Sequence, residues 1–257
     1  MHIYIYDSFV NQKKYDSTTA KIETRITDLG LNGKIVRLGM MNSVDEVINN
    51  EIKKGAKTIV VVGNNDIFNK AINAIAKTSQ EITLTKKIPL GFIPVGKKNN
   101  DIAKFLGIGF EESACNIISA RRIQTLDLGL ANDNYFLTEA SITTSGTNLE
   151  IDQNYTIEIK EPGTIKIINF PVNTKLPKNF YCCAQDQILD LYIEKTQKKK
   201  LFSGNKEENS LIPFKLLTVI NKKKPLIIDE TKKLNTPVNI QIAKQKISLI
   251  VGKGIEI

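Results

Sequence analysis

The chain has 257 residues, of which 41% are hydrophobic and 25% charged, enough to bury a full hydrophobic core as one large domain or as two lobes. No apolar run approaches the ~20 residues that a membrane span needs, and the opening stretch, MHIYIYDSF, turns polar too soon for a signal peptide. Three cysteines, two of them adjacent, and a single histidine argue against a disulfide framework, a paired-cysteine metal site and a His-based triad. We therefore expect a reducing, cytoplasmic compartment.

Strands and helices alternate through the first half of the chain. Alternating or continuous apolar runs predict strands at 2–6, 34–38, 58–63 and 88–96. Apolar residues at helical spacing predict helices at 18–29, 43–55, about 66–77, 102–106 and 110–120. In the second helical segment Ser43 and Glu46 have capping-box spacing and Gly55 is the stop signal. This alternation predicts an open, doubly wound α/β lobe at residues 1–122.

The pattern changes after about residue 123, where short alternating runs are separated by turn residues. They predict strands at 121–130, 134–144, 154–160, 163–170, 179–184, 187–195, 214–221, 225–229, 237–244 and 246–252. No helical pattern of useful length occurs among them. The fold class expected is thus α/β plus β, with an antiparallel β-sandwich lobe at residues 123–257 whose last strands can return to the first lobe.

Two polar loops each connect a predicted strand to a predicted helix. They are GNND at 63–66 and PVGKKNND at 94–101. Ligands of open α/β sheets bind beyond the carboxyl ends of the strands, and a helix N-terminus suits an anion. Gly96 would let the backbone approach a ligand closely, and Lys97 and Lys98 add positive charge. Either loop alone is more typical of a plain turn with an Asn cap, but together they predict one shared phosphate site with the loops side by side.

The order and spacing of these segments resemble the diacylglycerol kinase catalytic-domain family, which includes bacterial lipid kinases and sphingosine kinases and has NAD kinases as distant relatives. GNNDIFNK at 63–70 is similar to the family's GGDGTxNE loop, and PVGKKNNDIAKFLGI at 94–108 to its PxGTxNDFAxxLGI loop. TLDLGLANDNYFLTEAS at 125–141, AQDQILDLYI at 184–193 and IIDE at 227–230 follow in the family's order. The resemblance therefore covers most of the chain.

The resemblance implies ATP and Mg²⁺ in a nucleotide cleft between the two lobes, and a lipid hydroxyl as the acceptor. It implies nucleotide binding by residues of both loops: Gly63, Asn64, Asn65, Asp66, Asn69, Gly96, Lys97, Lys98, Asn100 and Asp101. It also implies that Asp229 activates the acceptor hydroxyl, that Glu230 supports it or binds metal, and that Asn65 occupies the position of a catalytic carboxylate. The alternative for Asp229 and Glu230 is a simple turn between two strands. The metal ligands stay unassigned.

The first loop departs from the family's pattern at four of its five signature positions. Glycine, aspartate, glycine and threonine are replaced by Asn64, Asn65, Asp66 and Ile67. An amide takes no proton and binds Mg²⁺ less well than a carboxylate does. Asp66 can supply the lost charge only one residue out of register. In the second lobe Thr138 replaces the family's usual asparagine.

Two functions stay open on this basis: an active or weakened ATP-dependent lipid kinase, and a pseudokinase that keeps the fold for nucleotide binding, lipid binding or partner interaction. The net charge of +9 favours anionic partners such as a nucleotide or an anionic membrane surface, although a solvated lysine-rich surface has the same composition. Without zinc spacing or an aromatic RNA-binding run, we do not expect nucleic acid as the partner. A homodimer through edge strands is compatible with the sequence.

Overall fold

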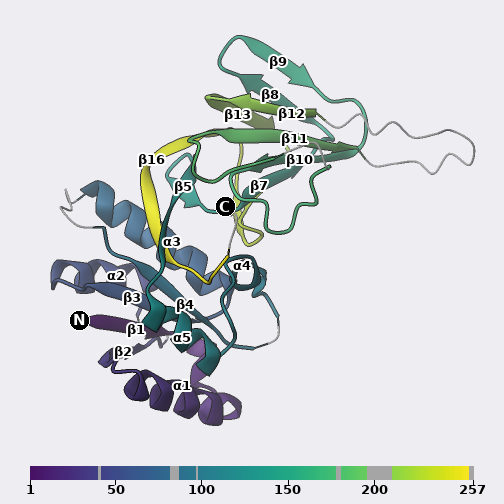
Figure 1. Ribbon diagram of the computed structural model, residues 1–257. Coiled ribbons are helices and arrows are strands. Elements are labelled where there is room, and N and C mark those ends of the chain that lie inside the picture. Colours follow the sequence, from purple (N-terminus) through teal and green to yellow (C-terminus); the bar gives the residue numbers. More distant parts are fainter. Residues whose placement is uncertain (40–41, 82–86, 97, 178–180, 196–209, 255–257) are drawn as a thin grey trace, which may run out of the picture. The chain divides into compact units, whose positions relative to one another are not determined.

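The computed structural model describes residues 1–39, 42–81, 87–96, 98–177, 181–195 and 210–254 (Figure 1). The chain forms two compact units. Unit 1 comprises Met1–Leu126 and Gln245–Glu256, and unit 2 comprises Asp127–Lys244. Two strands, β5 (Ile123–Ala131) and β16 (Val238–Ile250), contribute residues to both units. No helix of the described segments is long and apolar enough to cross a membrane.

Unit 1 is built on a parallel sheet in the order β2-β1-β3-β4, and the end of β16 pairs with β4. The strands are β1 (His2–Tyr6), β2 (Gly33–Arg37), β3 (Thr58–Gly63) and β4 (Leu90–Pro94). The helices are α1 (Asp16–Asp28), α2 (Val44–Lys53), α3 (Asn65–Glu81), α4 (Asp101–Phe105) and α5 (Glu112–Ala120), with 3-10 turns η1 (Ser8–Asn11) and η2 (Lys13–Tyr15) before α1. Helix α1 packs against α5, and α2 against α3 (Figure 1). The predicted doubly wound α/β architecture is confirmed.

The sequence of β3 explains its central place in this sheet. All six of its residues are buried, and its apolar β-branched side chains suit a strand covered by helices on both faces. The neighbouring helix α2 begins where the capping box predicted, because the hydroxyl of Ser43 accepts a hydrogen bond from the backbone N–H of Glu46 at 3.1 Å. After α2 the chain turns at Gly55, whose φ of +84° lies in the left-handed region.

Unit 2 consists of two antiparallel sheets packed face to face. One has the order β16-β13-β8-β9, with β5 pairing β16 and β6, and the other has the order β12-β11-β10-β7-β14-β15. Their remaining strands are β6 (Asn134–Phe136), β7 (Glu139–Thr143), β8 (Thr147–Ile151), β9 (Tyr155–Glu158), β10 (Gly163–Ile168), β11 (Leu189–Lys195), β12 (Ser210–Phe214), β13 (Leu216–Asn221), β14 (Leu226–Ile228) and β15 (Lys232–Leu234). Leu149 and Val219 of the first sheet share one buried core with Ile165 and Leu191 of the second. The predicted β-sandwich is therefore present.

Several strands differ from the expectation. The runs at 237–244 and 246–252 form one strand, β16, because no turn residue interrupts the alternation between them. The strand expected at 179–184 is absent from 181–184, and residues 179 and 180 lie outside the described residues. Strands β8, β12 and β15 were not predicted, and the three residues of β15, KKL, are too few and too polar to show a period of two.

Removal of the Ser43 cap tests how much the predicted helix start contributes. Because Ser43→Ala leaves the N–H of Glu46 without its partner, we expect a loss of about 1 kcal/mol in the free energy of unfolding. Ser43→Asp retains an acceptor and should stay close to wild type. Urea unfolding of the three proteins measures the difference, and equal losses in both variants would contradict the role of the cap.

Candidate functional site

The two polar loops lie side by side at the carboxyl ends of β3 and β4. The strands pair in parallel with Gly63 opposite Pro94, and the N–H of Val95 donates to the carbonyl of Gly63 at 2.7 Å. One step further on, the N–H of Asn65 donates to the carbonyl of Asn99 at 2.8 Å. The adjacency expected from the strand order is thus present, and the loops are joined by direct hydrogen bonds.

The N-terminus of α3 is capped from within the loop. The side-chain oxygen of Asn64 accepts hydrogen bonds from the N–H groups of Asp66 at 3.0 Å and Ile67 at 3.4 Å. The carbonyl of Asn64 accepts from the N–H of Phe68 at 3.3 Å, and the N–H of Asn65 is bound to Asn99. The first four N–H groups of α3 therefore all have partners inside the protein. This is what a plain turn with an Asn cap, the alternative to a phosphate site, predicts.

Buried acceptor oxygens gather in the same two loops. The Oδ1 atoms of Asn65, Asp66, Asn69 and Asn100 are buried and have no hydrogen-bond partner among the described residues. Asn65 is 7% exposed and Asn100 3%, and the amide of Asn100 donates to the carbonyl of Gly96 at 2.8 Å. Asn65 and Asn69 lie one turn apart on one face of α3. Four buried oxygen acceptors in the loops and the first turns of α3 thus have no donor among the described residues.

Glycine occupies positions 63 and 96 of the loops for two different local reasons. A Cβ at Gly63 would lie 2.8 Å from Cγ2 of Ile67 and 3.0 Å from Cβ of Asp7, so a larger residue would force one of these side chains to shift. Gly96 has a φ of +85°, which favours glycine, and a Cβ there would meet only the hydroxyl of Tyr15 in ordinary contact. Asp7, at the end of β1, was not singled out from the sequence, although its position directly after the first strand is the signal that finds it.

The charged residues of the second loop are less enclosed. Lys98 is exposed, and Asp101 is partly exposed and pairs with Lys104 at 3.6 Å. Lys97 lies outside the described residues. Of the two lysines from which a positive face was expected, the described residues include only Lys98.

ATP and Mg²⁺, which the resemblance implies, fit this arrangement poorly. A phosphate at a helix N-terminus is bound by free backbone N–H groups, and those of α3 already have partners. Mg²⁺ favours carboxylate oxygens, and GNND provides one carboxylate, Asp66. Among the described residues, no group of three or more His, Cys, Asp or Glu side chains is placed to hold a metal ion.

Asp229 occupies the turn between β14 and β15 in unit 2, and its carboxylate is buried there. Oδ1 accepts hydrogen bonds from the N–H of Thr138 at 2.8 Å and from its hydroxyl at 2.7 Å. Oδ2 accepts from the N–H of Leu137 at 3.2 Å. Both Asp229 and Glu230 have positive φ, 45° and 63°. Asp229 and Glu230 therefore lie in a turn between two strands, which the sequence had left open as an alternative. This turn buries the carboxylate of Asp229.

Burial dominates the acidity of this group. Loss of solvation raises the pKa of Asp229 from 3.8 to about 6, and the hydrogen bonds from Thr138 and Leu137 hold it from rising further. A carboxyl group with a pKa near neutrality is suited to take up a proton from a hydroxyl. Glu230 is exposed and accepts a hydrogen bond from the amide of Asn173 at 2.5 Å.

A second buried amide holds the segment that contacts Asp229. Asn169 donates to the carbonyl of Leu137 at 2.6 Å and to that of Asp127 at 2.9 Å. The carboxylate of Asp127 in turn accepts from the N–H of Gln187 at 2.7 Å. Asn169 lay inside a predicted strand and had no sequence signal, because its role depends on contacts between segments more than 30 residues apart.

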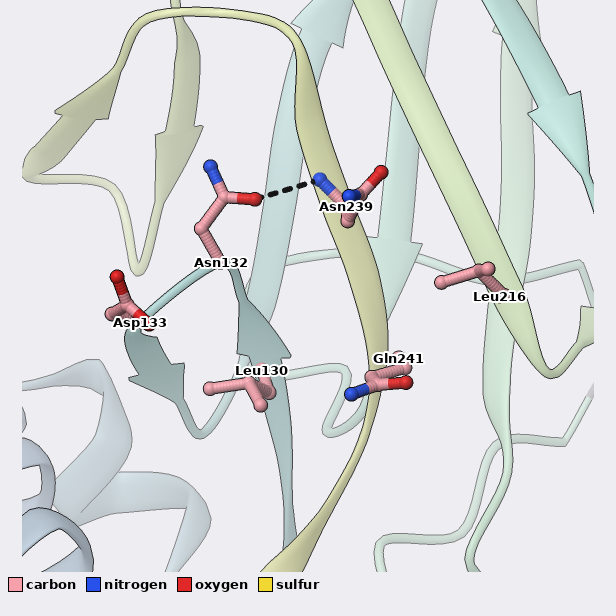
Figure 2. Close-up of a pocket in the computed structure, with 6 residues that line it drawn as sticks. All are labelled: Leu130, Asn132, Asp133, Leu216, Asn239 and Gln241. Carbon is pink, nitrogen blue, oxygen red and sulfur yellow. Dashed lines mark hydrogen bonds between the residues drawn. The ribbon is translucent and has the colours of Figure 1, made fainter.

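Unit 2 also carries an open hollow of about 500 Å³ (Figure 2). It is lined by Leu130, Asn132, Asp133, Leu216, Asn239 and Gln241. The side-chain oxygen of Asn132 accepts a hydrogen bond from the N–H of Asn239 at 2.9 Å (Figure 2). None of the candidate binding or catalytic residues lines this hollow, although Leu130, Asn132 and Asp133 belong to the 125–141 segment that resembles the family.

Comparison with known proteins gives a consistent result. The family model of the diacylglycerol kinase catalytic domain matches residues 2–131, just over half of the chain. A solved structure of a diacylglycerol kinase from Bacillus anthracis str. Sterne is similar to this chain, with a TM-score of 0.76 and 17% identity over 98% of this chain and 97% of that one. Two further structures from the same organism have TM-scores of 0.77 and 0.76 at 16% identity, each over 99% of this chain and 97% and 98% of theirs. No curated protein matches the chain.

The raised pKa of Asp229 predicts how stability depends on pH. The unfolded carboxyl group ionises near its ordinary value of 3.8, whereas the folded one retains its proton up to about pH 6. Because of this group, the free energy of unfolding falls as the pH rises from about 4 to about 6, by roughly 2–3 kcal/mol in total. We expect Asp229→Asn to flatten this part of the stability profile.

Chemical unfolding at several pH values between these limits measures the effect. Asp28→Asn, at the exposed end of α1, is the control for removal of one carboxylate. An Asp229→Asn profile parallel to that of wild type would show that Asp229 is ionised throughout this range.

Proposed function

Because the chain belongs to the diacylglycerol kinase catalytic-domain family, we propose that it is a lipid-kinase-like protein in which phosphate transfer from ATP to a lipid hydroxyl is slow or absent. The fold is that of solved diacylglycerol kinase structures, so the departure lies in the loops and not in the architecture. The partners that this function implies are a nucleotide and a lipid with a free hydroxyl.

One observation carries this proposal: Asn64 occupies the N–H groups that a phosphate would need. A phosphate can displace the Asn64 side chain only by breaking its hydrogen bonds to Asp66 and Ile67. Glycine at this position has no side chain to compete with the phosphate. Asn65 adds to the effect, because an amide replaces the family's carboxylate and lowers the affinity for Mg²⁺.

The second candidate function, an active lipid kinase, has its own support in Asp229. Its buried carboxyl group, with a pKa raised to about 6, matches the requirement for a base that takes a proton from the acceptor hydroxyl. Thr138 fixes the orientation of this group through two hydrogen bonds. The machinery around the acceptor would then be intact while the phosphate loop limits the reaction.

Repair of the first loop separates these candidates. The change of GNNDI to GGDGT, by Asn64→Gly, Asn65→Asp, Asp66→Gly and Ile67→Thr, removes the internal cap and restores a carboxylate in the family's register. One well-placed charge at a phosphoryl-transfer site is worth on the order of 3 kcal/mol, so we expect a gain of about 100-fold in turnover. The assay measures transfer of labelled phosphate from ATP to a short-chain diacylglycerol in detergent micelles.

Two controls accompany the assay. The repaired loop combined with Asp229→Asn should fall back to background, because the proposed base is then missing, and thermal melting verifies that each variant is folded. Rapid turnover by the wild type that falls on repair would overturn the proposal, since Asn64, Asn65 and Asp66 would then form a working variant site.

A further inference from the structure

The β14–β15 hairpin of unit 2 carries exposed lysines at both of its ends. Lys222, Lys223 and Lys224 form the turn that leads into β14, and Lys232 and Lys233 belong to β15. All five are exposed. The three turn lysines and Lys233 have no ion-pair partner among the described residues. We call these five residues the hairpin lysines.

A buried side chain holds the lysine turn in place. Asn221 is 6% exposed, and its Oδ1 accepts hydrogen bonds from the N–H groups of Lys223 and Lys224, both at 2.9 Å. Its amide donates to the carbonyl of Ser145 at 3.0 Å and to the hydroxyl of Thr147 at 2.8 Å. The backbone positions of the turn lysines are thus fixed by the sandwich, while their ammonium groups stay in solvent.

The same residue ties the turn to the segment that follows β15. The hydroxyl of Thr236 donates to the carbonyl of Asn221 at 2.5 Å and accepts from its N–H at 2.8 Å. In the hairpin, Leu226 pairs with Leu234 and Ile228 with Lys232. Lys232 therefore lies beside the Asp229 turn, and the other hairpin lysines continue from it along β15 to the turn before β14.

From this placement, we propose that the hairpin lysines form a docking surface for an anionic membrane. The inference rests on the proposed function, which requires a lipid acceptor, and it names the surface by which unit 2 would meet the bilayer. Each lysine close to an anionic bilayer contributes about 1 kcal/mol to binding. Docking here brings the lipid–water interface to the hairpin that carries Asp229.

The surface fits a membrane better than a nucleic acid. Proteins that bind single strands stack bases on aromatic side chains, and residues 221–226 and 231–236 contain no aromatic residue. Three adjacent lysines in one turn present point charges that suit a plane of anionic headgroups.

The test is sedimentation with vesicles of phosphatidylcholine alone and of phosphatidylcholine with about one third phosphatidylserine. We expect the wild type to bind the anionic vesicles selectively and to be released by salt. Lys222→Gln/Lys223→Gln/Lys224→Gln should weaken this binding by about two orders of magnitude, because three contributions of ~1 kcal/mol are lost. Asn221 accepts its hydrogen bonds from the backbone N–H groups of Lys223 and Lys224 and not from their side chains, so the fold tolerates the change.

The matched control is Lys53→Gln/Lys57→Gln/Lys77→Gln, which removes the same charge from exposed sites of unit 1 and should retain binding. Equal losses in both triple variants, equal binding to neutral vesicles, or equally tight binding to a DNA duplex that the hairpin variant loses would overturn the proposal. The measurement uses no ATP, and the kinase assay uses micelles, so the failure of one proposal is distinguishable from the failure of the other.

Discussion

The parallel pairing of β3 and β4 is the constraint on which the candidate nucleotide site depends. It brings Gly63 opposite Pro94, so that the chain leaves both strands at one edge of the sheet. The hydrogen bond from Asn65 to Asn99 then fixes the loops against each other. Because β3 is fully buried, the start of the first loop is anchored in the core of unit 1. The strand ends are thus held together, and the side chains of the two loops decide the chemistry of the site.

Those side chains change the polarity of the site. Glycines in the first loop would leave the N–H groups of α3 free for an anion. Asn64 supplies the acceptor itself, and the buried oxygens of Asn65 and Asn100 are further acceptors that have no donor in the described part of the chain. The same substitution that stabilises the helix start therefore competes with the ligand. In unit 2 the opposite holds, since burial of Asp229 costs stability but yields a carboxyl group that titrates near neutrality.

The periodicity of apolar residues was sufficient to predict the architecture, because the strands and helices of each layer share one apolar pattern. The continuous apolar run of β3 predicted a doubly covered parallel strand, and short alternating runs predicted the sandwich. The adjacency of the two loops followed from strand order alone. The direction of the Asn64 side chain could not be predicted in this way, because an asparagine after glycine can face a ligand or cap its own helix. The environment of Asp229 could not be predicted from the sequence either, since its partners Leu137 and Thr138 lie 91 or more residues away along the chain.

The measurement that tests the central claim most directly is a nuclear magnetic resonance titration of backbone amides with ATP, in wild type and in Asn64→Gly. Glycine costs little at a helix cap, so the comparison isolates the side-chain oxygen. If Asn64 holds the N–H groups of Asp66 and Ile67, their resonances should stay in place in the wild type and shift on addition of ATP in the variant. Equal shifts of both amides in the two proteins would show that phosphate reaches α3 despite Asn64, which would contradict the account.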